Sequence, residues 1–159
     1  MDFRIGFGYD VHQLVENHQL WLGGILIPAE KGCIAHSDGD VLIHAICDAL
    51  LGSLSLGDLG HQFPDTSEDF KNIDSKILLK RTCVLVKDRS YSIVNVDSTI
   101  CLQKPKISSY INDMKKIISN ILEINKEMIS IKATTTERMG FVGEEKGISA
   151  YAVVMVKAV

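Results

Sequence analysis

The sequence lacks the segments that carry a protein into or across a membrane. Nowhere do about 18 apolar residues follow one another, which is the length that a membrane-spanning helix needs. The first residues, Met1-Asp2-Phe3-Arg4, also lack the basic head and apolar run of a secretory signal. We therefore expect no membrane contact and predict a cytoplasmic protein.

Strong charge of one sign is also missing. The formal net charge is −3, and lysine and arginine are scattered along the chain apart from short pairs such as Lys80-Arg81. Binding to nucleic acid rests largely on clustered basic residues that neutralise backbone phosphates. We expect no nucleic-acid partner.

Cysteine is present, but not in a pattern that binds metal or performs redox chemistry. Cys33, Cys47, Cys83 and Cys101 include no Cys-x-x-Cys pair. Three of the four lie in apolar surroundings, where a free thiol behaves as a small hydrophobic side chain. The pattern predicts reduced thiols in a reducing compartment, rather than disulfides or a thiolate metal site.

The hydrophobic pattern predicts one α+β domain over residues 1–159. The chain has no internal repeat, linker or low-complexity tract, and its length is sufficient to bury a core without disulfides. Alternating or short apolar runs predict strands at 3–11, 20–22, 25–27, 93–102, 128–134 and 148–156. Capping residues and apolar stripes predict helices from Ser37 to near Gly57, from Asp74 or Ser75 to about Lys87, and over 106–122. We expect a small mixed β-sheet with the helices packed on one face.

One carboxylate and two histidines have a spacing that favours a metal site. In an extended strand the side chains of Asp10 and His12 share a face and lie about 6.6 Å apart along the chain. Ser37 followed by Asp40 reads as a capping box that starts a helix and places His44 about two turns along it. Such a ligand set suits tetrahedral zinc with its fourth position left to water or substrate.

Alternative interpretations of these residues remain open. His44 lies in the apolar stretch 41–46, where a histidine is more often a core residue than a ligand. Asp48 follows on the same helix face four residues later. Gly6 and Gly8 share a strand face with Asp10 and would admit either a ligand or another backbone.

Two polar clusters follow predicted strand ends. Thr134-Thr135-Thr136-Glu137 offers hydroxyls for phosphate oxygens and a carboxylate for a hard cation, although it also fits a strand end that caps a turn. Gln103-Lys104-Pro105-Lys106 would meet an anion or form a solvated loop. The polar, turn-rich stretch 57–74 is long for a structureless loop, and such loops are usually functional lids or mobile segments.

Taken in order, these motifs resemble one enzyme family over essentially the whole chain. That family is 2-C-methyl-D-erythritol 2,4-cyclodiphosphate synthase. The resemblance rests on Asp10-Val-His12, Gly23-Gly24, Ile27-Pro28, His36-Ser-Asp-Gly-Asp40, His44-Ala45, Asp48-Ala-Leu-Leu-Gly52, Leu56-Gly-Asp58, Gly60, Phe63-Pro-Asp-Thr66, Asn95-Val-Asp97, Gln103, Pro105-Lys106, Lys132-Ala-Thr-Thr-Thr-Glu137 and Gly140-Phe141.

The resemblance implies a reaction of the non-mevalonate isoprenoid pathway. The 2-phosphate of 4-diphosphocytidyl-2-C-methyl-D-erythritol 2-phosphate attacks the β-phosphorus, giving a cyclic diphosphate and CMP. Asp10, His12 and His44 would bind zinc, and Glu137 would bind a second cation, magnesium or manganese. His36 and Thr135 would stabilise the transition state. Family members are homotrimers whose active sites are shared between neighbouring subunits.

The resemblance also implies which residues bind the substrate. The methylerythritol phosphate would contact Ser37, Asp58, Leu59, Gly60, Phe63 and Asp65, with Asp48 supporting the same pocket. The cytidine and its phosphates would contact residues 102–108, among them Leu102, Gln103, Pro105 and Lys106, together with Thr134, Thr135 and Thr136. The substrate-binding set is completed by Asp10, His12, His36, Glu137 and Phe141.

The chain departs from the family pattern in two places. Many members have Asp-Thr-Asp-Pro where this chain has Asp65-Thr66-Ser67-Glu68, which removes a carboxylate and a rigid turn. Many members also carry arginine at the position of Glu144, where it helps to bind an isoprenoid diphosphate in the central cavity of the trimer. A carboxylate there repels such a ligand, so we expect no binding of geranyl or farnesyl diphosphate.

Two rival functions come from other classes. A non-catalytic trimeric binding module would keep the metal site for stability alone. A zinc phosphohydrolase would use the same ligands to activate water and would release free phosphate.

Overall fold

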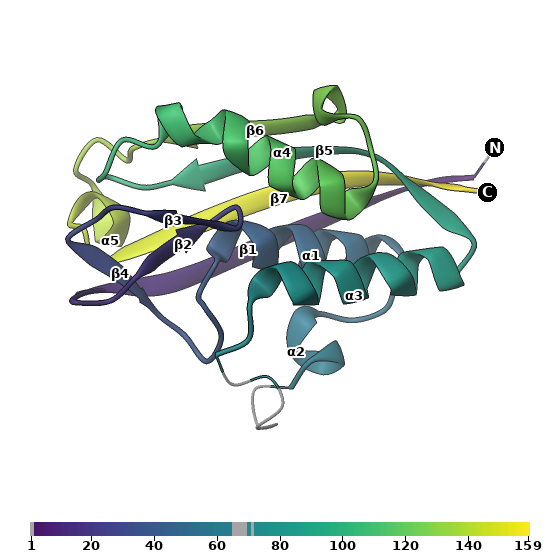
Figure 1. The fold of residues 1–159 in the computed structure, drawn as a ribbon, viewed down its shortest axis with the longest axis horizontal. Helices are drawn as coiled ribbons and strands as arrows, with labels where there is room; N and C mark the ends of the chain where they lie inside the picture. The colour runs from purple at the N-terminus through teal and green to yellow at the C-terminus, as the bar shows by residue number, and fades with distance from the viewer. Residues whose placement is uncertain (1, 65–69, 71) are drawn as a thin grey trace.

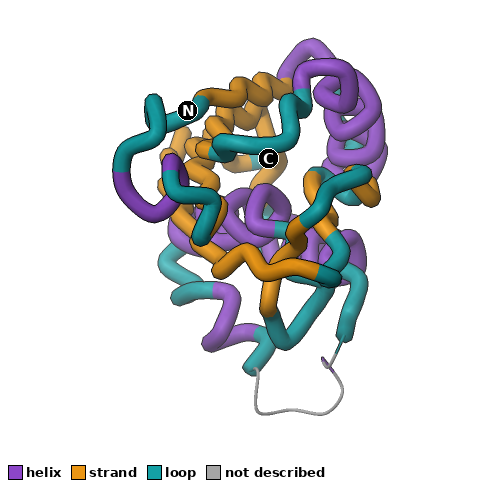
Figure 2. The backbone as a smooth tube through the Cα atoms, turned by 90° about the vertical axis from the view of Figure 1, so that its left-hand side faces the viewer, coloured by secondary structure: helices purple, strands orange, loops and turns teal. Residues whose placement is uncertain are grey.

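A five-stranded mixed sheet carries the three longer helices on one of its faces (Figure 1). The computed structural model describes residues 2–64, 70 and 72–159. In the view of Figure 2 the long helices lie to one side of the sheet strands. The elements are β1 (Phe3–Glu16), β2 (Leu20–Leu22), β3 (Ile25–Ile27), β4 (Lys31–Ile34), α1 (Val41–Ser53), α2 (Leu59–Gln62), α3 (Ser75–Asp88), β5 (Tyr91–Cys101), η2 (Ser108–Tyr110), α4 (Ile111–Leu122), η3 (Lys126–Met128), β6 (Ile129–Thr134), α5 (Gly140–Gly143) and β7 (Gly147–Ala158). The predicted α+β class is confirmed.

The strands of the large sheet follow the order β4-β1-β7-β5-β6. All neighbours are antiparallel except β5 and β6, which run parallel. β1 continues to Glu16, beyond the predicted end at residue 11, because its last four residues pair with β4. β2 and β3 form a separate small hairpin around Gly23-Gly24, as predicted.

The two faces of β1 differ in size and exposure. Gly6 and Gly8 face the helices, and a Cβ atom added to Gly8 would lie 1.9 Å from the carbonyl oxygen of Ala45. The opposite face carries large exposed side chains, including Ile5 and Phe7. Of the two alternatives left open for the glycines, a close backbone approach is therefore the observed one, and it brings β1 against α1.

Helix α1 begins later than the capping-box interpretation predicts. The side chain of Asp40 accepts a hydrogen bond from the backbone N–H of Ile43, so Asp40 is the N-cap and the first helical residue is Val41. Ser37 lies outside the helix, where its hydroxyl accepts from the N–H of Gly39. His44 consequently lies in the first turn rather than two turns along, and the helix ends at Ser53 rather than near Gly57.

The other predicted helices and strands are present and differ only at their ends, whereas β4, α2, α5 and the short 3₁₀ turns were not predicted. α3 begins at Ser75 with Asp74 as its N-cap, as expected. α4 begins at Ile111 rather than Lys106, because Ser108–Tyr110 forms a separate 3₁₀ turn. All four cysteines are free, and Cys33, Cys47 and Cys83 are buried, in agreement with the predicted thiols.

No helix within residues 2–64, 70 and 72–159 combines the length and the apolar character needed to cross a membrane.

Candidate metal centre and active site

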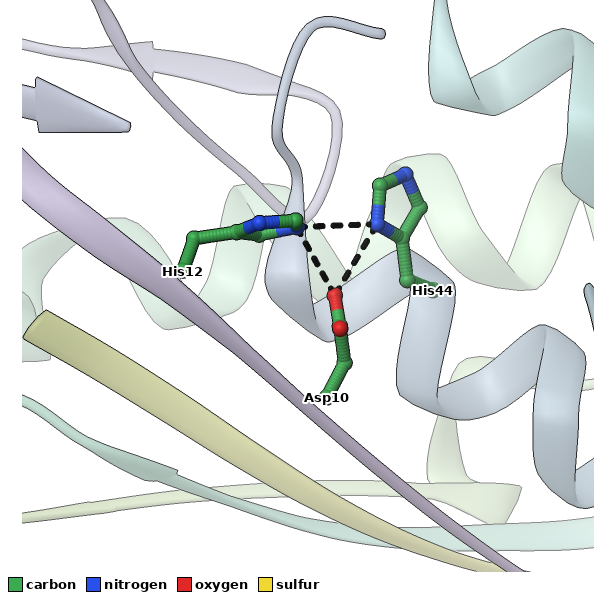
Figure 3. A group of neighbouring side chains, drawn as sticks. All are labelled: Asp10, His12 and His44. Carbon is green, nitrogen blue, oxygen red and sulfur yellow. Dashed lines mark hydrogen bonds and ion pairs between the residues drawn. The ribbon is translucent and has the colours of Figure 1, made fainter. Parts of the chain in front are cut away.

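The side chains of Asp10, His12 and His44 converge between β1 and α1 (Figure 3). Asp10 Oδ2 lies 2.9 Å from His12 Nε2 and 3.0 Å from His44 Nδ1. The two imidazole nitrogens are 3.1 Å apart. Two residues come from one face of a strand and the third from the first turn of the helix that packs on it, so the local fold assembles the group.

The surroundings of this group favour an ionised carboxylate. Burial alone would raise the pKa of Asp10, but hydrogen bonds from His12 and His44 outweigh it and hold that pKa well below its usual range. Burial lowers the pKa of His44, yet the facing carboxylate of Asp10 raises it above its usual value overall. The ionised carboxylate of Asp10 therefore lies where the three ligand atoms meet.

The donor set fits a divalent cation. Zinc bound tetrahedrally at about 2.0–2.2 Å sets its ligand atoms about 3.3–3.6 Å apart, so the observed triangle needs to open by only a few tenths of an ångström. Carboxylate oxygens and unprotonated imidazole nitrogens all present lone pairs, which repel at this separation unless protons or a cation lie between them. The arrangement suits a zinc ion held by Asp10, His12 and His44, with a fourth position left for a ligand.

A cavity of about 320 Å³ adjoins this group. Its walls include the predicted ligands His12 and His44 together with the predicted substrate-binding residues His36, Ser37, Leu59, Gly60 and Phe63. The carboxylate of Asp48 accepts a hydrogen bond of 2.7 Å from the N–H of Leu59, which ties α2 to α1. Asp58 caps α2 by accepting from the N–H of His61. Asp65 lies outside the described residues.

A second cavity, of about 170 Å³, collects the residues predicted to bind the nucleotide. Leu102, Gln103, Pro105, Lys106, Ile107, Ser108, Ala133, Thr134 and Thr135 line it. The hydroxyl of Thr135 donates to the Glu137 carboxylate at 3.1 Å. Thr136 donates to the carbonyl oxygen of Met139, so the turn-capping alternative holds for this threonine. Phe141 lies against Gly147 at the start of β7.

A family model described as the YgbB family matches residues 3–157. The chain belongs to the YgbB family. Two curated relatives named 2-C-methyl-D-erythritol 2,4-cyclodiphosphate synthase illustrate the likeness. The protein from Bacteroides fragilis is 54% identical over 159 residues, which is 100% of both chains. The protein from Fusobacterium nucleatum is 53% identical over 154 residues, covering 97% of this chain and 96% of the relative.

Solved structures related to this YgbB-family chain share its fold. The structure titled 2C-methyl-D-erythritol-2,4-cyclodiphosphate synthase is 34% identical, with a TM-score of 0.90 over 97% of this chain and 100% of that one. IspF of Plasmodium falciparum, solved as a CDP complex, is 36% identical, with a TM-score of 0.86 over 98% of this chain and 96% of that one. The structure of the bifunctional IspDF from Campylobacter jejuni is 39% identical, with a TM-score of 0.95. That match covers 99% of this chain and 43% of the bifunctional chain.

Within one copy of this YgbB-family chain, the two predicted halves of the site lie apart. Asp10 pairs with Ala150, Ala150 with Ile100, and Ile100 with Ala133. Three strand spacings of about 4.8 Å therefore separate Asp10 from the residue before Thr134 by about 14 Å. Among the described residues, Glu137 is not part of the Asp10, His12 and His44 group.

Sequence reasoning missed two residues behind His44: Ser75, which contacts it, and Asp38, which contacts Ser75. Ser75 Oγ lies 2.9 Å from His44 Nε2, and Asp38 accepts hydrogen bonds from Ser75. Serine and aspartate are adjacent in both segments, as Ser37-Asp38 and as Asp74-Ser75. However, 37 residues separate Asp38 from Ser75, and no periodic pattern in the sequence connects them. A cavity of about 550 Å³ lined by Cys83, Tyr91 and Leu122 holds none of the predicted residues.

Proposed function

We propose that this chain is a 2-C-methyl-D-erythritol 2,4-cyclodiphosphate synthase formed by one domain, residues 1–159. Its substrate is 4-diphosphocytidyl-2-C-methyl-D-erythritol 2-phosphate. An oxygen of the 2-phosphate forms a bond to the β-phosphorus while the bond from that phosphorus to the bridging oxygen breaks. CMP leaves with the bridging oxygen, and the cyclic diphosphate remains.

The observation that carries this proposal is the convergence of Asp10, His12 and His44 beside a cavity lined by His36 and Ser37. Zinc held there would neutralise charge on a phosphate oxygen and orient that phosphate. The cavity walls supplied by Leu59, Gly60 and Phe63 would then hold the methylerythritol part.

His36 and Thr135 are proposed to stabilise the transition state. Phosphoryl transfer depends mainly on positioning and on neutralising developing negative charge, and an imidazole and a hydroxyl can donate hydrogen bonds to the reacting oxygens. The backbone N–H of Asn72 donates a hydrogen bond of 2.8 Å to the carbonyl oxygen of His36, which holds the backbone at that residue. Glu137, beside Thr135, would bind the second cation, magnesium or manganese.

We infer that the working form is a homotrimer with its active sites at subunit interfaces. Cations that act on one diphosphate lie about 3.5–4 Å apart in two-metal sites, whereas about 14 Å separate the strands that lead to the two halves in one chain. A neighbouring copy that brings its own β6 end to the Asp10 group resolves this mismatch. The nucleotide half finds support in the CDP complex of the Plasmodium falciparum relative.

The outer face of the sheet supports association as well. Large apolar side chains of β1 and β7 are exposed there, although a monomer rarely exposes so continuous a patch. They are Phe3, Ile5, Phe7, Tyr9 and Val11 on β1 and Tyr151 and Val153 on β7. Tyr9 and Tyr151 pack against each other across the two strands, with ring centroids 4.9 Å apart and the rings tilted by 39°. A cytoplasmic location remains a prediction.

The deciding experiment follows the phosphorus-31 spectrum of the substrate mixed with metal-loaded protein. We expect a cyclic diphosphate and stoichiometric CMP, and neither product with His44→Ala. Inorganic phosphate as the product would identify the phosphohydrolase instead. Unchanged substrate with a protein that still binds zinc would leave the binding module as the function.

A further inference from the structure

The two ring nitrogens of His44 face different surroundings. Nδ1 faces the carboxylate of Asp10 at 3.0 Å, on the side where a cation would bind. Nε2 faces away from that point and lies 2.9 Å from Ser75 Oγ and 3.2 Å from Ser37 Oγ. A neutral imidazole carries its proton on one nitrogen only, so the partner of Nε2 decides whether Nδ1 is free to bind a cation.

The carboxylate of Asp38 fixes the direction of the bond between Ser75 and His44. Both oxygens of this carboxylate accept from Ser75: Oδ1 from the hydroxyl and Oδ2 from the backbone N–H at 2.9 Å. An ionised carboxylate cannot donate, so the hydroxyl proton of Ser75 points toward Asp38. The remaining lone pairs of Ser75 Oγ face His44, and they can only accept a proton from Nε2.

The three residues form a rigid unit. Ser75 and His44 are buried, and Ser75 is the first residue of α3. Asp38 is held from its own side, because its N–H donates to the carbonyl oxygen of Ile73 at 3.1 Å and its Oδ1 accepts from the N–H of Asp40 at 3.1 Å. The hydrogen bonds that link His44 to Asp38 through Ser75 are therefore held by neighbouring backbone groups.

We propose that Asp38 and Ser75 are positioning residues that keep the proton of His44 on Nε2 and present Nδ1 unprotonated to the metal. This inference rests on the metal site of the proposed function. A metal-binding histidine commonly donates its second ring N–H to an oxygen, and loss of such a partner lowers metal affinity by about 10- to 100-fold. Here a serine hydroxyl is that oxygen, and Asp38 orients the hydroxyl.

Chelator competition with zinc as the probe tests the proposal on the full-length protein. We expect Ser75→Ala to raise the zinc dissociation constant by about 10- to 100-fold. Asp38→Asn should also raise this constant. Each carboxylate oxygen of Asp38 accepts a hydrogen bond from a backbone N–H, of Asp40 or of Ser75. In Asp38→Asn the NH₂ group replaces one of these oxygens and cannot accept that hydrogen bond. The backbone hydrogen bond from Ser75 to Asp38 survives in Ser75→Ala, so the link between α3 and the loop before α1 is retained.

Ser53→Ala is the matched control, because Ser53 is buried in α1 and its hydroxyl donates to the Leu50 carbonyl oxygen. It should leave zinc affinity unchanged. A second readout is the Nε2 proton of His44 in zinc-loaded protein, followed by nuclear magnetic resonance. Its exchange with water should be slow in the wild type and fast in Ser75→Ala.

The outcomes separate the two proposals. Unchanged zinc affinity and unchanged proton exchange in Ser75→Ala, with normal zinc binding by the wild type, would overturn the role of Ser75 and leave the synthase proposal intact. A wild type that binds no zinc would overturn both. Weaker binding in both variants together with fast exchange, and none of this in Ser53→Ala, would establish the positioning role.

Discussion

Gly8 has no side chain, and this allows β1 and α1 to approach closely enough to bring His44 to Asp10. A Cβ atom added to Gly8 would lie 1.9 Å from the carbonyl oxygen of Ala45, the residue that follows His44 in the chain. Backbone cannot yield as a flexible side chain can, so Gly8→Ala should push α1 away from β1. We expect the free energy of unfolding to fall by about 1–3 kcal/mol or more, and zinc binding to weaken as His44 moves from Asp10. Chemical denaturation and zinc titration measure the two effects.

Gly52→Ala is the matched comparison. An added Cβ there would meet only Phe7 O at 3.9 Å, which is ordinary contact. Replacing a helix glycine by alanine should stabilise the protein by about 0.5–1 kcal/mol. If Gly8→Ala were as well tolerated as Gly52→Ala, the close approach of β1 and α1 would not be what positions His44.

Glu144 carries the prediction about isoprenoid diphosphates. Its carboxylate forms an ion pair of 2.6 Å with Lys146 and is about half exposed. Because a carboxylate repels a diphosphate, neither geranyl nor farnesyl diphosphate should bind, whereas Glu144→Arg should gain affinity. Calorimetry and native mass spectrometry measure both proteins. One prenyl diphosphate bound per three wild-type chains at micromolar concentration would contradict the prediction.

Asp40 joins two elements that are distant in sequence. Its buried carboxylate accepts from the N–H of Ile43 in α1 and from the N–H groups of Gly23 and Gly24 in the hairpin turn. Asp40→Ala should therefore lose an N-cap worth about 0.5–2 kcal/mol. It should also leave two buried N–H groups unpaired, at about 1–3 kcal/mol each. Chemical denaturation should show a loss of several kcal/mol.

Asp74→Ala provides the scale for that measurement, because Asp74 caps α3 at a partly exposed position. Its loss should cost about 1 kcal/mol. Equal losses in the two variants would mean that the hydrogen bonds of Asp40 to the hairpin contribute little.

The start of α1 shows where sequence reasoning on helices fails. Ser37 and Asp40 both suit an N-cap, and local pattern alone favoured Ser37. The choice falls on Asp40 because Gly39 has a positive φ of 74°, which interrupts the helix, and because the hairpin turn supplies further donors to Asp40. Those donors lie 16 and 17 residues away, which no local rule takes into account.

Other features were predictable because they depend on local periodicity. Because side chains alternate between the two faces of a strand, Asp10 and His12 share one face. A helix that packs on this face can bring His44 to them. The hydrogen bonds from His44 to Ser75 and from Ser75 to Asp38 were not predictable, since they require the start of α3 to pack against the loop before α1. The candidate ligands could be predicted from residue type and local spacing. The groups that hydrogen-bond to them depend on tertiary packing and could not.

At the scale of the whole molecule, the fold places the two halves of the site at different positions on one sheet. The proposed metal half lies on β1 and α1, and the proposed nucleotide half lies at the ends of β5 and β6. A ring of identical subunits joined head to tail brings unlike surfaces together at every interface. The exposed apolar face of β1 and β7 offers the surface on which such a ring would close.

A complementation experiment tests this arrangement. His44→Ala removes the metal half and Glu137→Gln the nucleotide half, so each variant alone should be inactive. In mixed trimers, one interface can combine an intact metal half from one subunit with an intact nucleotide half from the next. Random mixing in equal amounts restores about a quarter of the sites, so co-expression should recover up to roughly that share of wild-type activity. If both halves came from the same chain, every site in the mixture would still carry one substitution, and activity would stay at the level of the separate variants.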